Sequence, residues 1–67
     1  MDKVWLVLTK YISYQGNELE ISFNHVNIEV CKSKHGAEFR AGIISATWHD
    51  SVLTKLDEIV VEEYEVI

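Results

Sequence analysis

The sequence predicts an α+β fold: a small antiparallel sheet of about four to five strands that begins with a hairpin, with one short helix before the last strand. Three observations predict this fold. β-Branched and aromatic residues are dense, which favours strands. A turn signal separates two apolar runs near the N-terminus, and a helix-start signal precedes the last apolar run. We expect 67 residues to form a single domain, residues 1–67.

The N-terminal hairpin rests on two alternating runs. Residues 3–14 are apolar on both faces, with Val4, Leu6 and Leu8 on one face and Trp5, Val7 and Tyr11 on the other. A strand that is apolar on both faces is typical of the centre of a sheet. Gln15-Gly16-Asn17 is a turn signal. Residues 18–23 then alternate, so we expect Leu19, Ile21 and Phe23 to face inward.

Residues 24–36 fit either a strand or a helix. As a helix they would begin at Asn24 as the N-cap and end at Gly36. As a strand, Val26, Ile28 and Val30 share one face. β-Branched residues and asparagines disfavour a helix, which favours the strand. Ser33 to Gly36 would then turn into a further strand over residues 38–48, with Gly42 as a bulge.

The helix is expected to begin at His49-Asp50-Ser51, because Asp50 or Ser51 can accept a hydrogen bond from the first helical turn. Val52, Leu53 and Leu56 follow at the spacing of one helix face, which predicts about two turns. The chain then returns as a strand over residues 59–66. A longer helix through Tyr64 is the alternative, but Ile59-Val60-Val61 favours the strand.

Charge and cysteine content narrow the partners and the compartment. Net charge is −5, with eleven acidic and six basic residues, which argues against direct binding to nucleic acid or anionic lipid. The single cysteine fits a reducing cytoplasm. The apolar run of residues 4–8 is too short for a membrane span. We expect a cytoplasmic protein, in the host cell cytoplasm if it is viral.

The candidate binding residues lie mainly in the last eleven residues, DEIVVEEYEVI. Glu62, Glu63 and Glu65 surround Tyr64 in an acidic patch suited to a basic protein surface. The alternative is a solvated strand end whose carboxylates discourage aggregation. Trp5 and Tyr11 are the second candidates, because an exposed stripe on that face would bind a partner or form a homodimer.

Catalytic and metal-binding patterns are weak. The candidate metal ligands lack the paired spacing of structural zinc sites: they are His25, Cys31, His35 and His49. The three glycines are scattered, so they do not form a phosphate-binding loop, and no segment is typical of a nucleophile elbow. We expect no catalytic residue, no metal and no cofactor, and therefore a protein that is not an enzyme.

Three segments carry a resemblance to a known class of proteins: KVWLVLTKY, GNELEISF and IVVEEYEVI. They resemble very small accessory proteins encoded by bacteriophages, over residues 3–23 and 59–67. In such proteins a helix commonly follows the second strand, where this sequence has the strand-like VNIEV. The resemblance implies a phage protein of host takeover that binds and inhibits or redirects a host protein, such as a defence factor, a nuclease or the transcription machinery.

The expected function is therefore that of a small acidic protein-binding module, an inhibitor or modulator of a host protein with a basic surface. Two alternatives stay open. One is a nucleic-acid mimic that blocks a DNA- or RNA-binding enzyme. The other is a self-associating structural protein that uses the face of Val4 to Tyr11 or the edge of the last strand.

Overall fold

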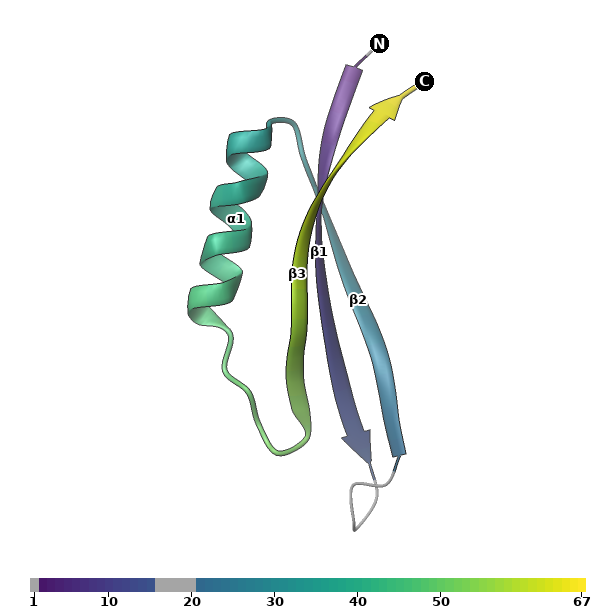
Figure 1. Cartoon of the computed structure of the whole chain (residues 1–67), viewed down its shortest axis with the longest axis vertical. Helices are drawn as coiled ribbons and strands as arrows, with labels where there is room; N and C mark the ends of the chain where they lie inside the picture. Colours follow the sequence, from purple (N-terminus) through teal and green to yellow (C-terminus); the bar gives the residue numbers. More distant parts are fainter. Residues whose placement is uncertain (1, 16–20) are drawn as a thin grey trace.

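The computed structural model describes residues 2–15 and 21–67. Its elements are, in chain order, β1 (Asp2–Gln15), β2 (Ile21–Cys31), α1 (Lys34–Thr47) and β3 (Thr54–Val66). The strands form one antiparallel sheet in the order β2-β1-β3, and α1 lies along one face of it (Figure 1). The α+β class, the hairpin and a helix before the last strand are confirmed. The described residues form three strands, however, and not four to five.

β1 is the central strand, as its two apolar faces predict. Leu8 lies opposite Ile28 of β2 and Val60 of β3, while its neighbour Val7 lies opposite Glu29 and Val61. Directly opposite residues of an antiparallel pair point to the same side of the sheet, and successive residues point to opposite sides. The predicted division of β1 into an odd-numbered face and an even-numbered face is thus confirmed.

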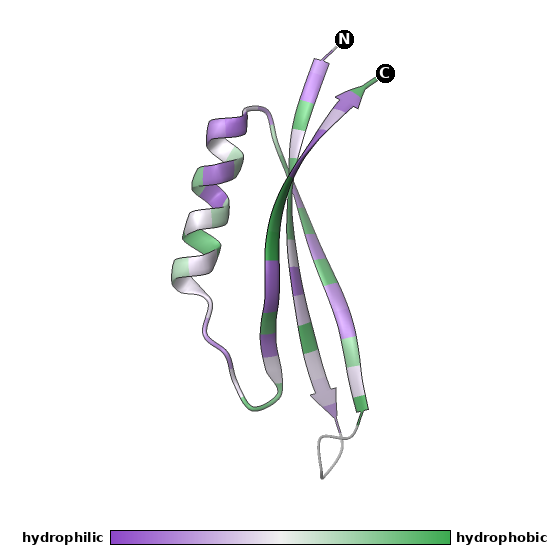
Figure 2. Ribbon diagram, in the orientation of Figure 1, coloured by the Kyte–Doolittle hydropathy of each residue, from purple (hydrophilic) through white to green (hydrophobic). Residues whose placement is uncertain are grey.

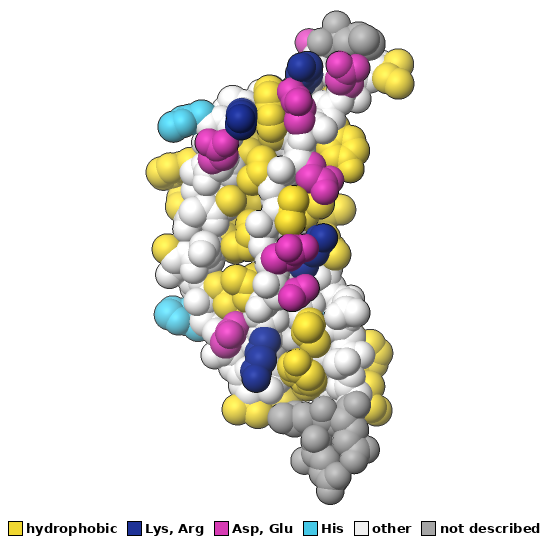
Figure 3. Space-filling model, in the orientation of Figure 1, with side chains coloured by type: hydrophobic (Ala, Val, Ile, Leu, Met, Phe, Trp, Pro, Cys, Tyr) yellow, Lys and Arg dark blue, Asp and Glu magenta, His cyan; other side chains and the backbone are white. Residues whose placement is uncertain are grey.

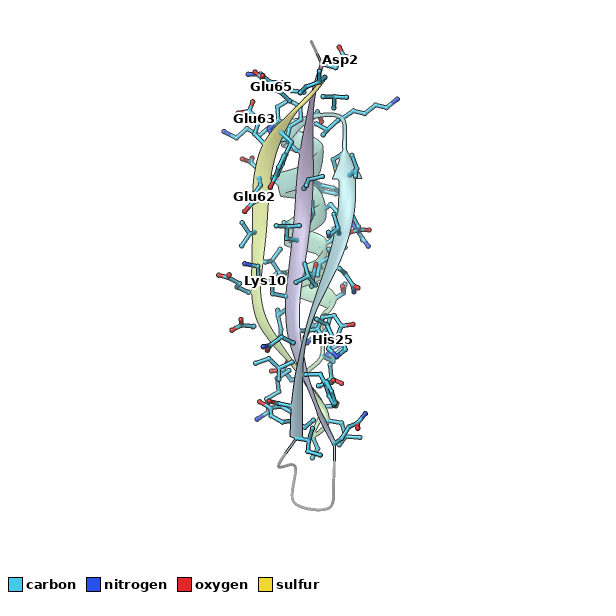
Figure 4. All side chains as sticks on the ribbon, turned by 90° about the vertical axis from the view of Figure 1, so that its right-hand side faces the viewer. Asp2, Lys10, His25, Glu62, Glu63 and Glu65 are labelled. Carbon is cyan, nitrogen blue, oxygen red and sulfur yellow. The ribbon has the colours of Figure 1, made fainter. Side chains whose placement is uncertain are left out.

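The two faces of the sheet differ in cover. Val7 is fully buried and Thr9 is 4% exposed, and both belong to the odd-numbered face of β1. α1 reaches this face through an ion pair between Arg40 and Glu29 of β2, with Nε and Oε2 at 2.9 Å. We call it the helix face. The opposite face, which carries the even-numbered residues of β1, is turned away from α1, and we call it the open face (Figure 4).

α1 begins where a cap and small residues coincide. The Ser33 hydroxyl accepts a hydrogen bond from the Gly36 N–H at 3.0 Å and so satisfies one unpaired donor of the first turn. Ala37 is fully buried, since its small side chain allows the helix backbone to approach the sheet. The helix ends at Trp48, whose backbone is extended and whose N–H donates to the Ile44 carbonyl at 2.9 Å.

The strand expected over residues 38–48 is wrong, because these residues form most of α1. Phe39 alternates with its neighbours as in a strand, yet it is 66% exposed on the helix. The less exposed positions fall on one side of the helix, three or four residues apart: Gly36 and Ala37, then Ala41, then Ile43 and Ile44, then Trp48. Gly42, expected as a bulge, and Gly36, expected in a turn, are helical as well. The strand expected for the preceding stretch is confirmed as far as Cys31.

The helix expected to begin at residues 49–51 is also wrong, because residues 48–53 connect α1 to β3. The side chains that suggested a helix cap bind backbone donors of this connection instead. Ser51 Oγ accepts from the N–H of Thr54 at 3.0 Å, and Asp50 Oδ1 accepts from the N–H of Leu56 at 2.9 Å. Serine and aspartate make such bonds in turns as readily as at helix starts.

The far end of the hairpin lacks helical cover. Ile21 and Phe23, expected to face inward, are 54% and 46% exposed. This end of the β1–β2 pair projects beyond α1 in Figure 1, so the helix cannot cover it. The expected turn at residues 16–17 and the expected inward position of Leu19 lie outside the described residues. The last strand is confirmed, and it begins earlier than expected, at Thr54.

Replacing Ser33 by alanine removes the cap of α1. We expect Ser33→Ala to lower the free energy of unfolding by about 1 kcal/mol, because the first helical turn loses a partner for its backbone donors. Chemical denaturation followed by circular dichroism measures the change. The control is Ser45→Ala within the same helix, which we expect to be neutral or stabilising by a few tenths of a kcal/mol. Equal losses in both variants would contradict the role of Ser33.

Truncating Val7 tests the position of the core. Val7→Ala removes two methyl groups from a fully buried site, and we expect it to lower the free energy of unfolding by roughly 2 kcal/mol. Val52→Ala removes the same groups from a side chain that is 72% exposed, and we expect less than about 0.5 kcal/mol. Similar effects at both sites in denaturant titrations would rule out a core centred under α1.

Asp50 gives the fold a dependence on acid. Its pKa lies below the ordinary value of 3.8, first because it accepts the Leu56 N–H and next because it accepts the Trp48 indole N–H at 2.8 Å. A carboxylate with a lowered pKa stabilises the fold above its unfolded pKa, and this contribution is lost as pH falls through the folded value. We expect thermal stability to fall less between pH 7 and pH 3 in Asp50→Asn than in the unchanged chain. An identical fall in both would contradict the assignment.

Candidate functional site

The open face of the sheet carries a broad apolar surface. On β2, Val26, Ile28 and Val30 are 50%, 61% and 64% exposed. Register places further apolar residues beside them on the same face, from β1 and β3: Val4, Leu6, Leu8, Ile12, Tyr14, Val60, Tyr64 and Val66. Figure 2 shows the hydrophobic residues alternating along β2. Nothing among the described elements packs over this face, so its side chains are available to a partner.

Charges on the open face lie towards β3. Lys10 Nζ of β1 lies 3.0 Å from Glu58 Oε1 of β3. This hydrogen bond, and then the charge of Glu58, raise the pKa of Lys10 above its ordinary value. Glu62 accepts a hydrogen bond from the Tyr64 hydroxyl at 3.0 Å, which raises the pKa of Tyr64 because the phenol is the donor. The β2 side of the face, at Val26 to Val30, carries no charged side chain.

The predicted acidic patch lies on β3, a strand at the edge of the sheet, and is divided between its two faces. Glu62 and Tyr64 belong to the open face, whereas Glu63 and Glu65 belong to the helix face. Glu63 Oε1 pairs with Lys3 Nζ of β1 at 3.2 Å. Acidic side chains extend along β3 in Figure 3, and Figure 4 labels Glu62, Glu63 and Glu65 along this edge. We call the carboxylates of β3 with Tyr64 the acidic edge.

The second pair of predicted residues, Trp5 and Tyr11, lies on the helix face and is half-buried. Trp5 is opposite Glu63 of the acidic edge. Tyr11 stacks on the His25 ring, with centroids 4.8 Å apart, and contacts the Trp48 ring at 5.4 Å. The structure therefore brings Trp5 close to the acidic edge and places Tyr11 in a separate aromatic cluster near the end of α1.

The aromatic cluster includes a pair that sequence analysis missed. Ser13 Oγ lies 2.7 Å from His25 Nε2, in a partly buried position. A hydroxyl beside an imidazole is part of the hydrolytic triad, which also needs a carboxylate on the other ring nitrogen. Among the described residues no carboxylate bonds to His25, and its ring stacks on Tyr11. The hairpin register brings the pair together, and without the register the sequence carries no signal for it.

A hollow of about 470 Å³ lies between α1 and β2, lined in part by Thr9, Asn27, Thr47 and Trp48. The Arg40–Glu29 ion pair lies at this hollow, and the hydrogen bond to Glu29 raises the pKa of Arg40 above its already high value. Within the described residues, all buried side-chain nitrogen and oxygen atoms have hydrogen-bond partners. Of the polar lining, Arg40 and Glu29 bind each other, and the Thr47 hydroxyl donates to the Ile43 carbonyl at 2.8 Å.

The candidate metal ligands are not brought together. In residues 2–15 and 21–67, no group of three or more His, Cys, Asp or Glu side chains could hold a metal ion. His25 belongs to the aromatic cluster, Cys31 ends β2, and His35 and His49 lie at opposite ends of α1.

In the described part of the chain, no helix is long and apolar enough to cross a membrane.

Comparison with known proteins gives no match: no family model, no curated protein and no solved structure matches this chain.

Proposed function

We propose that this chain is a protein-binding module that carries out no reaction of its own and modulates a host protein through the acidic edge. The resemblance of its ends to small bacteriophage proteins supports a phage-encoded inhibitor of defence, nuclease or transcription machinery. The observation that carries the proposal is the charge of β3: five carboxylates and one lysine lie between Thr54 and Val66. Such a surface favours a basic partner.

The ion pairs of β3 leave part of this charge available. Lys3 and Lys10 reach two carboxylates of the acidic edge, those of Glu63 and Glu58. Glu65 is exposed, and the group that binds Glu62 is the neutral hydroxyl of Tyr64 and not a cation. Exposed ion pairs are weak and exchange partners easily, so a basic partner also competes for the paired carboxylates.

The backbone of β3 adds a second means of binding. In the described sheet β3 pairs with β1 on one side, and its other side has no neighbouring strand. An extended segment of a partner can add to such an edge through main-chain hydrogen bonds. Glutamates there repel a second acidic strand and attract one rich in lysine or arginine. The edge therefore selects a basic extended segment.

Tyr64 supplies the contact area that charges lack. Its side chain is 48% exposed, and its hydroxyl is fixed by the bond to Glu62. Tyrosine is enriched among residues that dominate binding energy, because a rigid ring buries a large surface at little entropic cost. We therefore place Tyr64 at the centre of the interface, with the carboxylates around it.

Charge reversal on the acidic edge tests this function. Glu62→Lys/Glu63→Lys is expected to weaken binding to the host partner at least about ten-fold, because two attractive contacts become repulsive. The partner is the host protein that the unchanged chain retains from bacterial lysate at low salt and that a support without the chain does not retain. Affinity for the purified partner is then measured by calorimetry at low and high salt, and we expect it to fall with salt.

A matched pair of single variants separates position from net charge. Glu65→Lys changes the acidic edge and Glu38→Lys changes the exposed surface of α1, with the same change in net charge. We expect the first to weaken binding and the second to leave it unchanged. Equal affinities for all variants, with folds intact by circular dichroism, would reject the acidic edge as the binding surface. A partner that DNA displaces would instead favour the nucleic-acid mimic.

A further inference from the structure

The open face contains a strip without charge that the acidic edge does not use. We call it the apolar strip and define it as Val4, Leu6 and Leu8 of β1 with Val26, Ile28 and Val30 of β2. Lys10 lies opposite Val26 and borders the strip, and its ammonium group is directed to Glu58 of β3. Leu6 is opposite Val30 and Leu8 is opposite Ile28, so the side chains form one continuous surface. The three β2 residues are at least half exposed. A contiguous patch of this kind marks an interaction site.

A single copy of the described chain buries few hydrophobic side chains. Among the described residues, the fully buried hydrophobic side chains are those of Val7 and Ala37. Val7 belongs to the helix face of β1 and Ala37 belongs to α1. A chain of 67 residues is marginally stable on its own, and a second subunit is one of the usual remedies. An occupant of the apolar strip would give the sheet a second buried layer.

We propose that a second copy of this chain covers the apolar strip, so that the protein is a dimer with its two sheets packed face to face. Packed sheets lie about 10 Å apart, and their inner side chains interdigitate. The contact is isologous, because the same patch on each copy meets its counterpart across a two-fold axis. This inference goes beyond the proposed function and uses a different surface.

The area of the open face suits such a dimer. The contact is centred on the apolar strip, and its full extent with the rim is the open face: three strands spaced about 4.8 Å apart, over the 11 residues of β2 at roughly 3.3 Å each, have a projected area of about 500 Å² per copy. Two copies therefore bury at most about 1,000 Å², which is the lower limit for a specific interface. We accordingly expect a dissociation constant in the micromolar range, and not an obligate dimer.

The charge distribution selects the same occupant. The chain has a net charge of −5, so two copies repel each other wherever carboxylates meet. The carboxylates of the open face are Glu58 and Glu62 on β3, on the far side of β1 from β2, and Asp2 at the first residue of β1. A contact centred on the middle of β1 and β2 keeps all three at the rim, where water screens them. A basic partner would gain nothing from a strip without charge, whereas a second copy matches it.

Sedimentation equilibrium of the unchanged chain, from about 5 to about 500 µM, is the first test. We expect the mass to rise from 7.7 kDa towards twice that value. Ile28→Lys places a charge in the middle of the apolar strip, and we expect it to weaken association at least ten-fold. Phe39→Lys changes an equally exposed hydrophobic residue on α1, and we expect it to associate like the unchanged chain.

Three results would overturn the proposal: a mass of 7.7 kDa at every concentration, unchanged association of Ile28→Lys, or loss of association in Phe39→Lys. If Ile28→Lys fails to fold by circular dichroism, the melting temperature of the unchanged chain decides. It rises with concentration for a dimer and stays constant for a monomer. None of these results depends on the acidic edge, because binding of a basic partner is measured separately.

Discussion

One helix can cover one face of a sheet, and this limit governs the molecule. α1 takes the helix face, where Val7 and Ala37 are excluded from water. The sheet is nevertheless apolar on both sides, because β1 alternates between two hydrophobic faces. Hydrophobic burial is therefore incomplete within one copy of the described chain. The apolar open face is exposed because no described element covers it, and the acidic edge is accessible because β3 lies at the edge of the sheet.

The sequence predicts the sheet better than the helix, for a physical reason. β1 and β3 rest on runs of β-branched residues, and a turn signal in the sequence separates the runs that form β1 and β2. α1 has a hydrophobic pattern of similar strength at two periods, since alternating Phe39, Ala41 and Ile43 coexist with helical spacing. Ser33 is the N-cap of the helix, and a cap of one residue is a weak signal in a sequence. Ser51 carries the same signal and caps no helix.

The residues of the candidate site could be predicted from the sequence, but their pairing across the sheet could not. The alternation of a strand predicts that Glu62 and Tyr64 share one face and that Glu63 and Glu65 share the other, and the register agrees. Alternation does not identify the strand that pairs with β3. The ion pair between Glu63 and Lys3 of β1 therefore could not be predicted from the sequence. The exposure of Ile28 was likewise hidden. Alternation shows that Ile28 shares a face with Val26 and Val30, but it does not show whether the helix covers that face. The helix was expected at the wrong residues, so the exposed face could not be identified.

The two proposed surfaces are compatible because the dimer contact is centred on β1 and β2, away from the free edge of β3. The apolar strip belongs to β1 and β2, and the acidic edge belongs to β3 at the rim. Face-to-face dimers thus present two acidic edges, and a partner with two basic segments gains from the effective concentration of the second. β1 then serves both layers, with Val7 packed against α1 and Leu8 packed against the second copy. The unusual two-faced hydrophobicity of β1 is explained by this double role.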